Sequence, residues 1–161
     1  MADCIFCKII HGQTNGEEII FENDDCIVIL DRYRITSVGA ICLVIPKKHV
    51  QDITFLDDSI ASILMLTIKD ATVLSKTTFG AKGVRIWQAN GHTAGQSIGH
   101  LHFHIVPCNS VMDRIIAQFP ISFDIFRRHN IFLKNRQINK SKLSLYAERL
   151  RNNYNSRRDN G

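Results

Sequence analysis

Three histidines alternate with apolar residues in one short segment, His100-Leu-His-Phe-His-Ile-Val-Pro107. Successive side chains of an extended strand point to opposite faces, so this spacing predicts a β-strand with the imidazoles on one face. Alternate residues of a strand lie about 6.5–7 Å apart, which would place the three rings over one substrate-sized patch. Histidine suits nucleophilic and proton-transfer chemistry near neutral pH. Two alternatives remain for the segment by itself: surface histidines that alternate by chance, and a metal site that uses all three.

The rest of the chain has the periodicity of an α+β domain. Apolar runs bounded by turn residues predict four more strands, at residues 19–22, 26–31, 41–45 and 84–89. Apolar residues at helical spacing from Ile60 predict one long helix that runs to about Thr78 and ends before Gly80. We therefore expect an α+β fold with a five-stranded, mostly antiparallel sheet and one long helix.

Charge is distributed unevenly between the two parts of the chain. From residue 108 onward there are 11 Lys and Arg against 4 Asp and Glu, whereas residues 1–107 have 9 against 11. We divide the chain into a domain of residues 1–110 and a basic C-terminal extension of residues 111–161, with a helix over 141–152 and a frayed end from Tyr154. The extension has two interpretations, contact with a partner subunit and nucleic-acid binding, of which we favour the first.

Composition and cysteine usage indicate a globular protein of a reducing compartment. The 45% hydrophobic and 22% charged residues are ordinary for a globular domain. No run approaches the roughly 18 apolar residues of a membrane span, and no signal peptide is visible. Cys26, Cys42 and Cys108 lie singly in apolar surroundings, which is typical of small core residues. We expect a cytoplasmic protein that does not interact with membranes.

A polar loop over residues 90–99 leads into the histidine segment. Gly95 and Gly99 allow backbone amides to approach an anion, while Asn90, Gln96 and Ser97 offer neutral hydrogen-bond donors. Such a loop suits a phosphate that must later be released. By itself it is equally well explained as a polar turn.

Cys4 and Cys7 have the spacing of a zinc knuckle or a redox pair. Two thiolates make only half of a tetrahedral zinc site, so any further ligands must come from elsewhere in the chain. The alternative is two thiols in an N-terminal turn with no metal.

Together these residues resemble the histidine triad (HIT) family, and most of all its Hint-like branch. The resemblance rests on Gly95-Gln-Ser-x-x-His-x-His-x-His104 and on residues 4–10 and 43–49, within about residues 4–107. It implies a homodimer that acts on purine nucleotides in two steps. His102 would attack the α-phosphate to give a nucleotidyl-histidine, which water then hydrolyses. His104 would bind the phosphate oxygens and orient His102.

The resemblance also assigns the remaining site residues. Asn90, Gln96 and Ser97 would hold the phosphate and the leaving group, and Asp31 would accept hydrogen bonds from the ribose hydroxyls. The purine slot would be formed by Ile5, Phe6, Ile9, Ile29 and Leu30, each of which is alternatively a plain core residue. A structural zinc ion (Zn²⁺) would be held by Cys4, Cys7, His49 and His100, with His11 and His92 as rival ligands.

The sequence departs from the family pattern after Asp31, where residues 32–40 replace the usual Ser/Asn-Pro turn and Gly-His pair. This leaves open how the loop closes over the ribose. We expect a phosphoramidase or nucleotidyl hydrolase that acts on adenosine 5′-phosphoramidate-type substrates. The alternatives are a dinucleoside polyphosphate hydrolase, which the zinc knuckle disfavours, and a non-catalytic nucleotide- or zinc-binding regulatory module.

Overall fold

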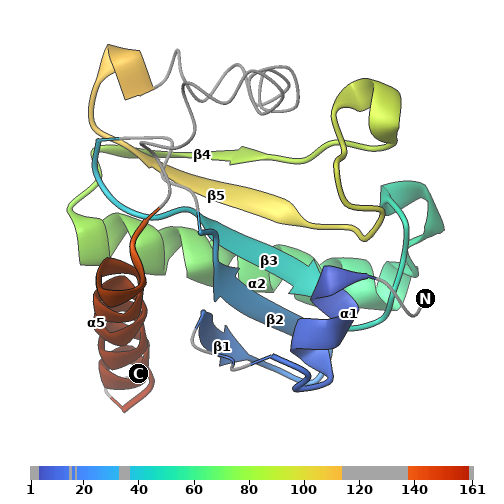
Figure 1. The fold of residues 1–161 in the computed structure, drawn as a ribbon, viewed down its shortest axis with the longest axis horizontal. Coiled ribbons are helices and arrows are strands. Elements are labelled where there is room, and N and C mark those ends of the chain that lie inside the picture. The colour runs from blue at the N-terminus through green and yellow to red at the C-terminus, as the bar shows by residue number, and fades with distance from the viewer. Residues whose placement is uncertain (1–3, 15, 17, 33–36, 114–137, 160–161) are drawn as a thin grey trace.

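Five strands form one antiparallel sheet in the computed structural model, which describes residues 4–14, 16, 18–32, 37–113 and 138–159 (Figure 1). The strands are β1 (Ile19–Glu22), β2 (Cys26–Leu30), β3 (Cys42–Pro46), β4 (Gly83–Trp87) and β5 (Phe103–Cys108). Their order is β1-β2-β3-β5-β4, so β5 lies between β3 and β4, and β4 is an edge strand. The predicted α+β fold with a five-stranded antiparallel sheet is confirmed.

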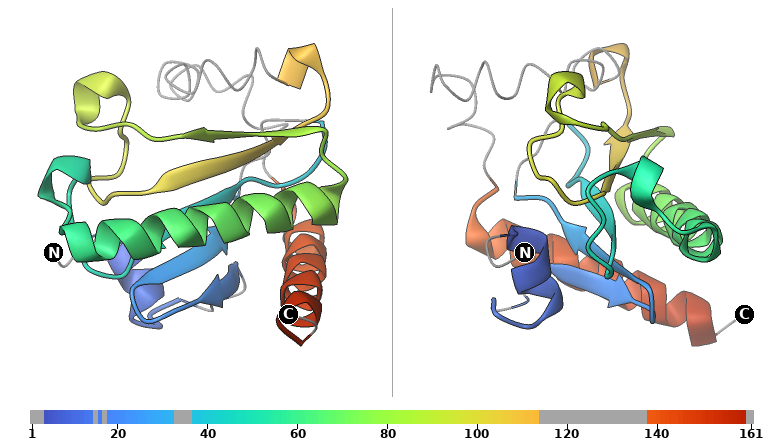
Figure 2. Two further views of the ribbon diagram at one scale, coloured as in Figure 1. Left: turned by 180° about the vertical axis from the view of Figure 1, so that it is seen from behind. Right: turned by 90° about the vertical axis from the view of Figure 1, so that its right-hand side faces the viewer.

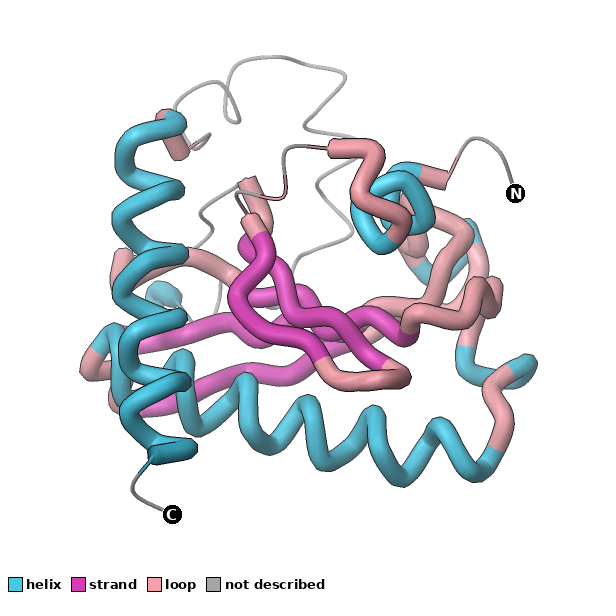
Figure 3. The backbone as a smooth tube through the Cα atoms, turned by 90° about the horizontal axis from the view of Figure 1, so that it is seen from below, coloured by secondary structure: helices cyan, strands magenta, loops and turns pink. Residues whose placement is uncertain are grey.

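Helices cover both faces of this sheet. The long helix α2 (Asp58–Phe79) packs on one face, as the view from behind shows, and the short helix α1 (Ile5–Ile10) lies on the other (Figure 2). A third helix, α5 (Lys140–Asp159), packs against α2 and β1 with its axis across that of α2 (Figure 3). Two short 3₁₀ turns, η1 (Ile53–Phe55) and η2 (His92–Ala94), lie in the connections. No helix in the described part of the chain is both long enough and apolar enough to cross a membrane.

The ends of α2 follow from local sequence. Gly80 ends the helix in the left-handed conformation at φ +62°, which glycine adopts without steric cost. Asp57 is the N-cap residue, but its carboxylate makes no capping bond and instead pairs with Lys48 Nζ at 2.5 Å. The observed helix begins at Asp58, two residues before the predicted start at Ile60.

Each sheet face has its own apolar core because side chains alternate along the strands. Val28 and Leu30 of β2 belong to the cluster under α2 and α5, whereas Ile27 and Ile29 belong to the cluster under α1. All five residues of β2 are consequently buried. We call the surface under α1 the α1 face, and it is the face on which the candidate site lies.

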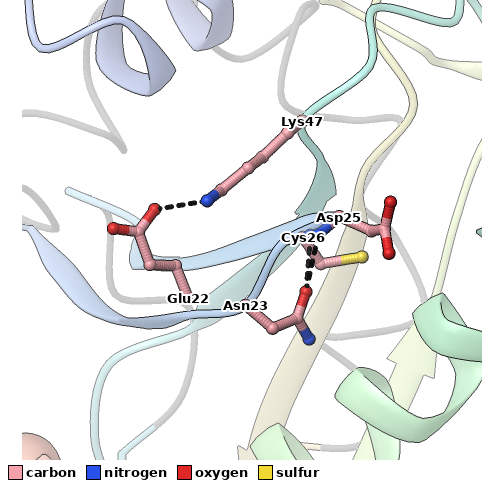
Figure 4. Close-up of polar contacts among 5 residues, drawn as sticks. All are labelled: Glu22, Asn23, Asp25, Cys26 and Lys47. Atoms are coloured by element: carbon pink, nitrogen blue, oxygen red, sulfur yellow. Dashed lines mark hydrogen bonds and ion pairs between the residues drawn. The ribbon is translucent and has the colours of Figure 1, made fainter.

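Asn23 shapes the turn between β1 and β2, in the region predicted to turn. Its Oδ1 accepts hydrogen bonds from the backbone nitrogens of Asp25 (3.0 Å) and Cys26 (2.7 Å) (Figure 4). Lys47 and Glu22 form an ion pair across the same end of the sheet at 2.8 Å. An asparagine that accepts hydrogen bonds from the backbone just after it mimics a backbone turn, and this stabilises the connection between β1 and β2.

Most predicted boundaries lie within two residues of the observed ones, but two differ by more. The histidine strand begins at Phe103 rather than His100, because Leu101 N instead bonds Val50 O at 2.8 Å in the loop after β3. The predicted frayed end from Tyr154 is helical to Asp159, since the Tyr154 ring stacks on Phe21 with centroids 4.1 Å apart.

Residues 114–137 of the extension lie outside the described residues, so the division at residue 110 stays a prediction. The described part of the extension nevertheless shares the main core. Four α5 residues join the cluster under α2, namely Leu143, Tyr146, Ala147 and Leu150. We therefore regard α5 as part of the folded unit.

Candidate active site and metal centre

Four potential metal ligands meet where α1, the loop after β3 and the segment before β5 come together. The ligand atoms of Cys4, Cys7, His49 and His100 all lie within 4.8 Å of one another. Cys7 Sγ lies 3.2 Å from His49 Nδ1 and 3.6 Å from His100 Nδ1. Two thiols and two imidazoles so arranged fit a metal site, whereas the rivals His11 and His92 are not in the cluster.

The surroundings of the cluster also favour a cation. Burial, reinforced by the neighbouring Cys4, raises the pKa of the Cys7 thiol, so two thiolates would not persist there without positive charge. His100 is fully buried, and its Nε2 lies 2.9 Å from Pro46 O. A proton on that nitrogen leaves Nδ1 unprotonated toward the cluster, which is the arrangement that metal-bound histidines have.

His102 is held in one tautomer by the backbone. Its Nδ1 lies 2.7 Å from His100 O, and a carbonyl oxygen only accepts, so Nδ1 carries the proton and Nε2 keeps its lone pair. The ring is only 8% exposed and meets Phe6 edge-on, with centroids 5.1 Å apart. Burial lowers the pKa of His102. The residue is therefore a neutral imidazole with an available nucleophilic nitrogen near neutral pH.

His104 lies beside His102 and is stacked on a tryptophan. The His102 and His104 ring centroids are 5.0 Å apart, and the Trp87 ring is parallel to His104 at 3.9 Å. Burial, with a smaller effect of His102, lowers the pKa of His104 well below its ordinary value. His104 is thus a neutral hydrogen-bonding group whose plane is set by Trp87.

The side chain of Gln96 is already bonded inside the polar loop. It is buried, its Oε1 accepts from Gly91 N at 2.7 Å, and its Nε2 donates to Gln51 O at 2.6 Å. Gln96 joins the loop to the segment after β3. Its carbonyl oxygen can accept one more hydrogen bond, and its amide NH₂ can donate one more.

Asn90 and Ser97 are both exposed, but they differ in their bonding. Asn90 Oδ1 accepts from Ile53 N at 3.0 Å, and its amide exchanges two hydrogen bonds with Gln88. Ser97 has no side-chain hydrogen bond to another described residue. Of the three loop residues, Ser97 has the least committed side chain.

The predicted nucleoside residues divide between the two faces of the sheet. Phe6, Ile9 and Ile29 lie together in the cluster on the α1 face, whereas Leu30 lies in the other cluster, under α2. Ile5 is 45% exposed on the outside of α1. The structure therefore brings three of the five predicted purine-slot residues together and separates Leu30 from them.

Asp31 follows β2 directly, and its backbone nitrogen donates to Ile41 O at 2.8 Å. The strand alternation that places Ile29 on the α1 face places Asp31 there as well. Trp87 was not predicted as a site residue. A signal was present, because two predicted strands joined by the loop of residues 90–99 would pair as a hairpin and bring β4 beside the histidines.

Comparison with known proteins shows similarity over most of this fold. The HIT domain family model matches residues 13–111. An uncharacterised HIT-like protein of Saccharolobus solfataricus is 33% identical over 116 residues, 72% of this chain and 81% of that protein. An adenosine 5′-monophosphoramidase of Candida albicans is 34% identical over 66% of this chain and 70% of its own length.

Solved structures show the same architecture. A hypothetical histidine triad nucleotide-binding protein of Sulfolobus tokodaii has a TM-score of 0.74 at 28% identity, covering 95% of this chain and 93% of its own. A zinc-bound histidine triad family protein of Mycobacterium smegmatis has a TM-score of 0.72 at 22% identity, covering 99% of each chain. The second likeness concerns the fold alone.

Proposed function

This chain belongs to the histidine triad family, and from that premise we propose that it is a nucleotide hydrolase or transferase acting at the α-phosphate of purine nucleotides. The observation that carries the proposal is the hydrogen bond between His102 Nδ1 and His100 O at 2.7 Å. It keeps the proton on Nδ1 and leaves the lone pair on Nε2 of a buried, neutral ring. A neutral imidazole can act as a nucleophile without a separate base.

The proposed reaction has two displacements at phosphorus. In the first, His102 Nε2 bonds to phosphorus while the bond from phosphorus to the leaving group breaks and the leaving group keeps the electron pair. An amine leaving group is protonated on nitrogen before this bond breaks, so that it departs as the neutral amine. In the second, water attacks phosphorus, the phosphorus–nitrogen bond breaks and its electrons return to Nε2. The water supplies one oxygen to the nucleotide, and its protons account for the released acid or the protonated leaving group. Dividing one difficult displacement into two lowers each barrier.

Neighbouring residues would bind the two ends of the nucleotide. His104 would donate to the phosphate oxygens, together with Ser97 and the remaining capacity of Asn90 and Gln96. Phe6, Ile9 and Ile29 would contact the purine, and Asp31 would accept from the ribose hydroxyls. The substrate that we propose is AMP joined to a small leaving group, as in adenosine 5′-phosphoramidate. The monophosphoramidase among the relatives supports this choice.

Zinc is the metal that we propose for the Cys4, Cys7, His49 and His100 cluster. Zn–S bonds of about 2.3 Å and Zn–N bonds of about 2.0 Å in a tetrahedron give S···N edges of about 3.6 Å and an N···N edge of about 3.3 Å. Cys4 Sγ lies 3.5 Å from His100 Nδ1, and the two histidine nitrogens lie 3.2 Å apart. These spacings support zinc in a structural role, joining α1 to the start of β5.

Assembly and location complete the proposal. We propose a homodimer, because β4 is an edge strand and the apolar Ile86 on it is 46% exposed.

Two cations of the basic extension stabilise the fold. Arg149 and Arg151 of α5 donate to the backbone oxygens of Thr78 and Ile19, and we therefore do not propose nucleic-acid binding for the extension. We propose contact with the partner subunit for the rest of the basic extension. A cytoplasmic location agrees with five free cysteines.

The test compares a fluorogenic adenosine phosphoramidate with diadenosine tetraphosphate as substrates. We expect turnover of the first to fall by about 10⁴-fold or more in His102→Ala, since a nucleophile is lost. His92→Ala, which removes an exposed histidine on η2, is the matched control and should retain full activity. Preference for diadenosine tetraphosphate would instead favour the polyphosphate hydrolase. No turnover of either substrate, with AMP still bound, would contradict the enzymatic proposal and favour a regulatory module.

A further inference from the structure

Three buried nitrogens without hydrogen-bond partners lie together on the α1 face. They are Arg85 Nε, Trp87 Nε1 and His104 Nδ1, which make up half of the six unpartnered buried side-chain polar atoms among the described residues. Trp87 pairs directly with His104 across the β4–β5 ladder, and Arg85 is two residues before Trp87 on the same face. We call Arg85, Trp87 and His104 the donor patch.

Leaving such atoms unpaired is costly. A buried polar group without a partner costs about 1–3 kcal/mol, so native proteins retain few of them and usually for a functional reason. Arginine Nε and indole Nε1 can only donate, and His104 Nδ1 donates in one of its tautomers. Neutral His104 has one N–H, which the proposed function places on the α-phosphate, so the two obligate donors Arg85 Nε and Trp87 Nε1 are the ones that call for an acceptor-rich, negatively charged group.

The sheet register places Arg85 and Trp87 of the donor patch on β4, one strand beyond His104, the residue proposed to bind the α-phosphate. Ile29 of β2 is in register with Leu43, Leu43 with His104, and His104 with Trp87. Neighbouring strands lie about 4.8 Å apart, so Trp87 is about 14 Å from Ile29 with His104 between them. A nucleoside under α1 and an α-phosphate at the histidines leave β4 for the group attached beyond that phosphate.

A cavity of about 570 Å³ adjoins the donor patch at Arg85. Lys82 and Cys108 also line it, and none of its lining residues is acidic. Burial and the nearby carboxylate of Asp113 raise the pKa of the Cys108 thiol, and that carboxylate accepts hydrogen bonds from Ser37 and from the backbone after β5. The two cations of the lining, Lys82 and Arg85, outnumber this one carboxylate, so the charge around the cavity is net positive and attracts an anion.

From these observations, and resting on the proposed function, we propose that the donor patch is a leaving-group subsite for an oxyanion, either a sulfate or a phosphate attached to the α-phosphate. An oxyanion of this kind departs with its electron pair and needs no proton, whereas an amine must be protonated. Donors already in place stabilise the charge that develops as the bond breaks.

The test measures kcat/KM for three substrates: adenosine 5′-phosphosulfate, diadenosine tetraphosphate and adenosine 5′-phosphoramidate. The readout is the ratio of either anionic substrate to the phosphoramidate. We expect Arg85→Gln to lower this ratio by about 10- to 100-fold, the usual effect of losing a charged hydrogen bond. Arg85→Lys, which keeps the charge, should give an intermediate ratio. Lys48→Gln removes an exposed cation that is paired with Asp57, and it should leave the ratio unchanged.

The outcomes separate the sources of the anion. A fall confined to the phosphosulfate identifies sulfate, and one confined to the tetraphosphate identifies phosphate. An equal loss on all three substrates, or no loss on any, overturns the subsite.

If the wild type hydrolyses none of these substrates, that result contradicts the proposed function but not the subsite. A binding measurement then tests the subsite separately. In His102→Ala protein, calorimetry compares the Kd of diadenosine tetraphosphate with that of AMP. We expect Arg85→Gln to weaken the first at least 10-fold more than the second. Equal changes in both, in protein whose circular dichroism is unaltered, would reject the subsite.

Discussion

The metal cluster and the donor patch border the same apolar cluster on the α1 face, but they differ in whether their polar atoms have partners. Every ligand atom of the metal cluster has another within 3.6 Å, and His100 also contacts a backbone oxygen. The three nitrogens of the donor patch have no partner among the described residues. The first region is completed by the chain and one ion, and we expect it to stabilise the fold. The second has no hydrogen-bond acceptors among the described residues, and we expect a bound substrate to supply them.

The largest expected effect is on the metal cluster. Cys7→Ser should abolish stoichiometric zinc and lower the free energy of unfolding by about 5 kcal/mol, since a structural zinc site contributes most of its binding energy to folding. Mass spectrometry of bound metal and urea denaturation measure both quantities. Cys108→Ser is the control, because it removes a thiol outside the cluster. Equal stability of Cys7→Ser and wild type would contradict the expectation that the metal cluster stabilises the fold.

Asp113 provides a second fully paired site for contrast. Its oxygens accept from Ser37 N (2.8 Å), Ser37 Oγ (2.9 Å), Asn109 N (3.0 Å) and Ser110 N (3.1 Å). Burial acts to raise its pKa, but these hydrogen bonds outweigh burial and hold the pKa of Asp113 below its ordinary value. Asp113→Asn should cost about 2 kcal/mol of unfolding free energy at pH 7.

The same shift fixes the sign of the pH effect at Asp113. Its stabilisation is present above the ordinary carboxyl pKa and is lost as the pH falls through the lowered one. The exposed Asp24→Asn is the control and should change stability very little. A similar loss in both variants would show that the hydrogen bonds to Asp113 contribute nothing specific.

The histidine of the donor patch should make the protein acid-sensitive. Because the pKa of His104 is lowered in the folded state, the unfolded chain binds more protons below about pH 6.5. Stability should therefore fall as the pH drops, by up to about 1.4 kcal/mol per unit from this residue. His104→Gln should reduce that slope in urea titrations between pH 7 and 5.5. Wild type and His104→Gln are compared at the same pH, so that loss of metal contributes equally to both unfolding free energies. Identical slopes would refute the prediction.

The smallest effect distinguishes the two regions most directly. Trp87→Phe keeps an aromatic ring beside His104 but removes the unpartnered Nε1 donor. We expect unfolding free energy to stay the same or rise by up to about 1 kcal/mol, because an unsatisfied buried donor is eliminated. Urea denaturation followed by circular dichroism measures it, since the variant has no tryptophan. A loss above about 2 kcal/mol would mean that Nε1 has a partner in the folded protein.

Much of the fold could be predicted because its signals are local. Strand β1 has the predicted bounds, and α2 follows the apolar spacing that ends at Gly80. The helix α1 was not predicted, since six residues are too few to show a helical period. The end of α5 was predicted to fray because its sequence is polar, yet Tyr154 is retained by its stack on Phe21.

The sequence by itself determined which residue types are available: alternating histidines, a Cys-x-x-Cys pair and a polar loop before them. Only the tertiary structure decided which of them meet. It placed His49 and His100 with the thiols rather than His11 or His92, and it set Trp87 against His104. The physical reason is that side-chain direction follows from local alternation along the chain. Partner choice between distant segments follows instead from strand register and from the packing of helices on the sheet.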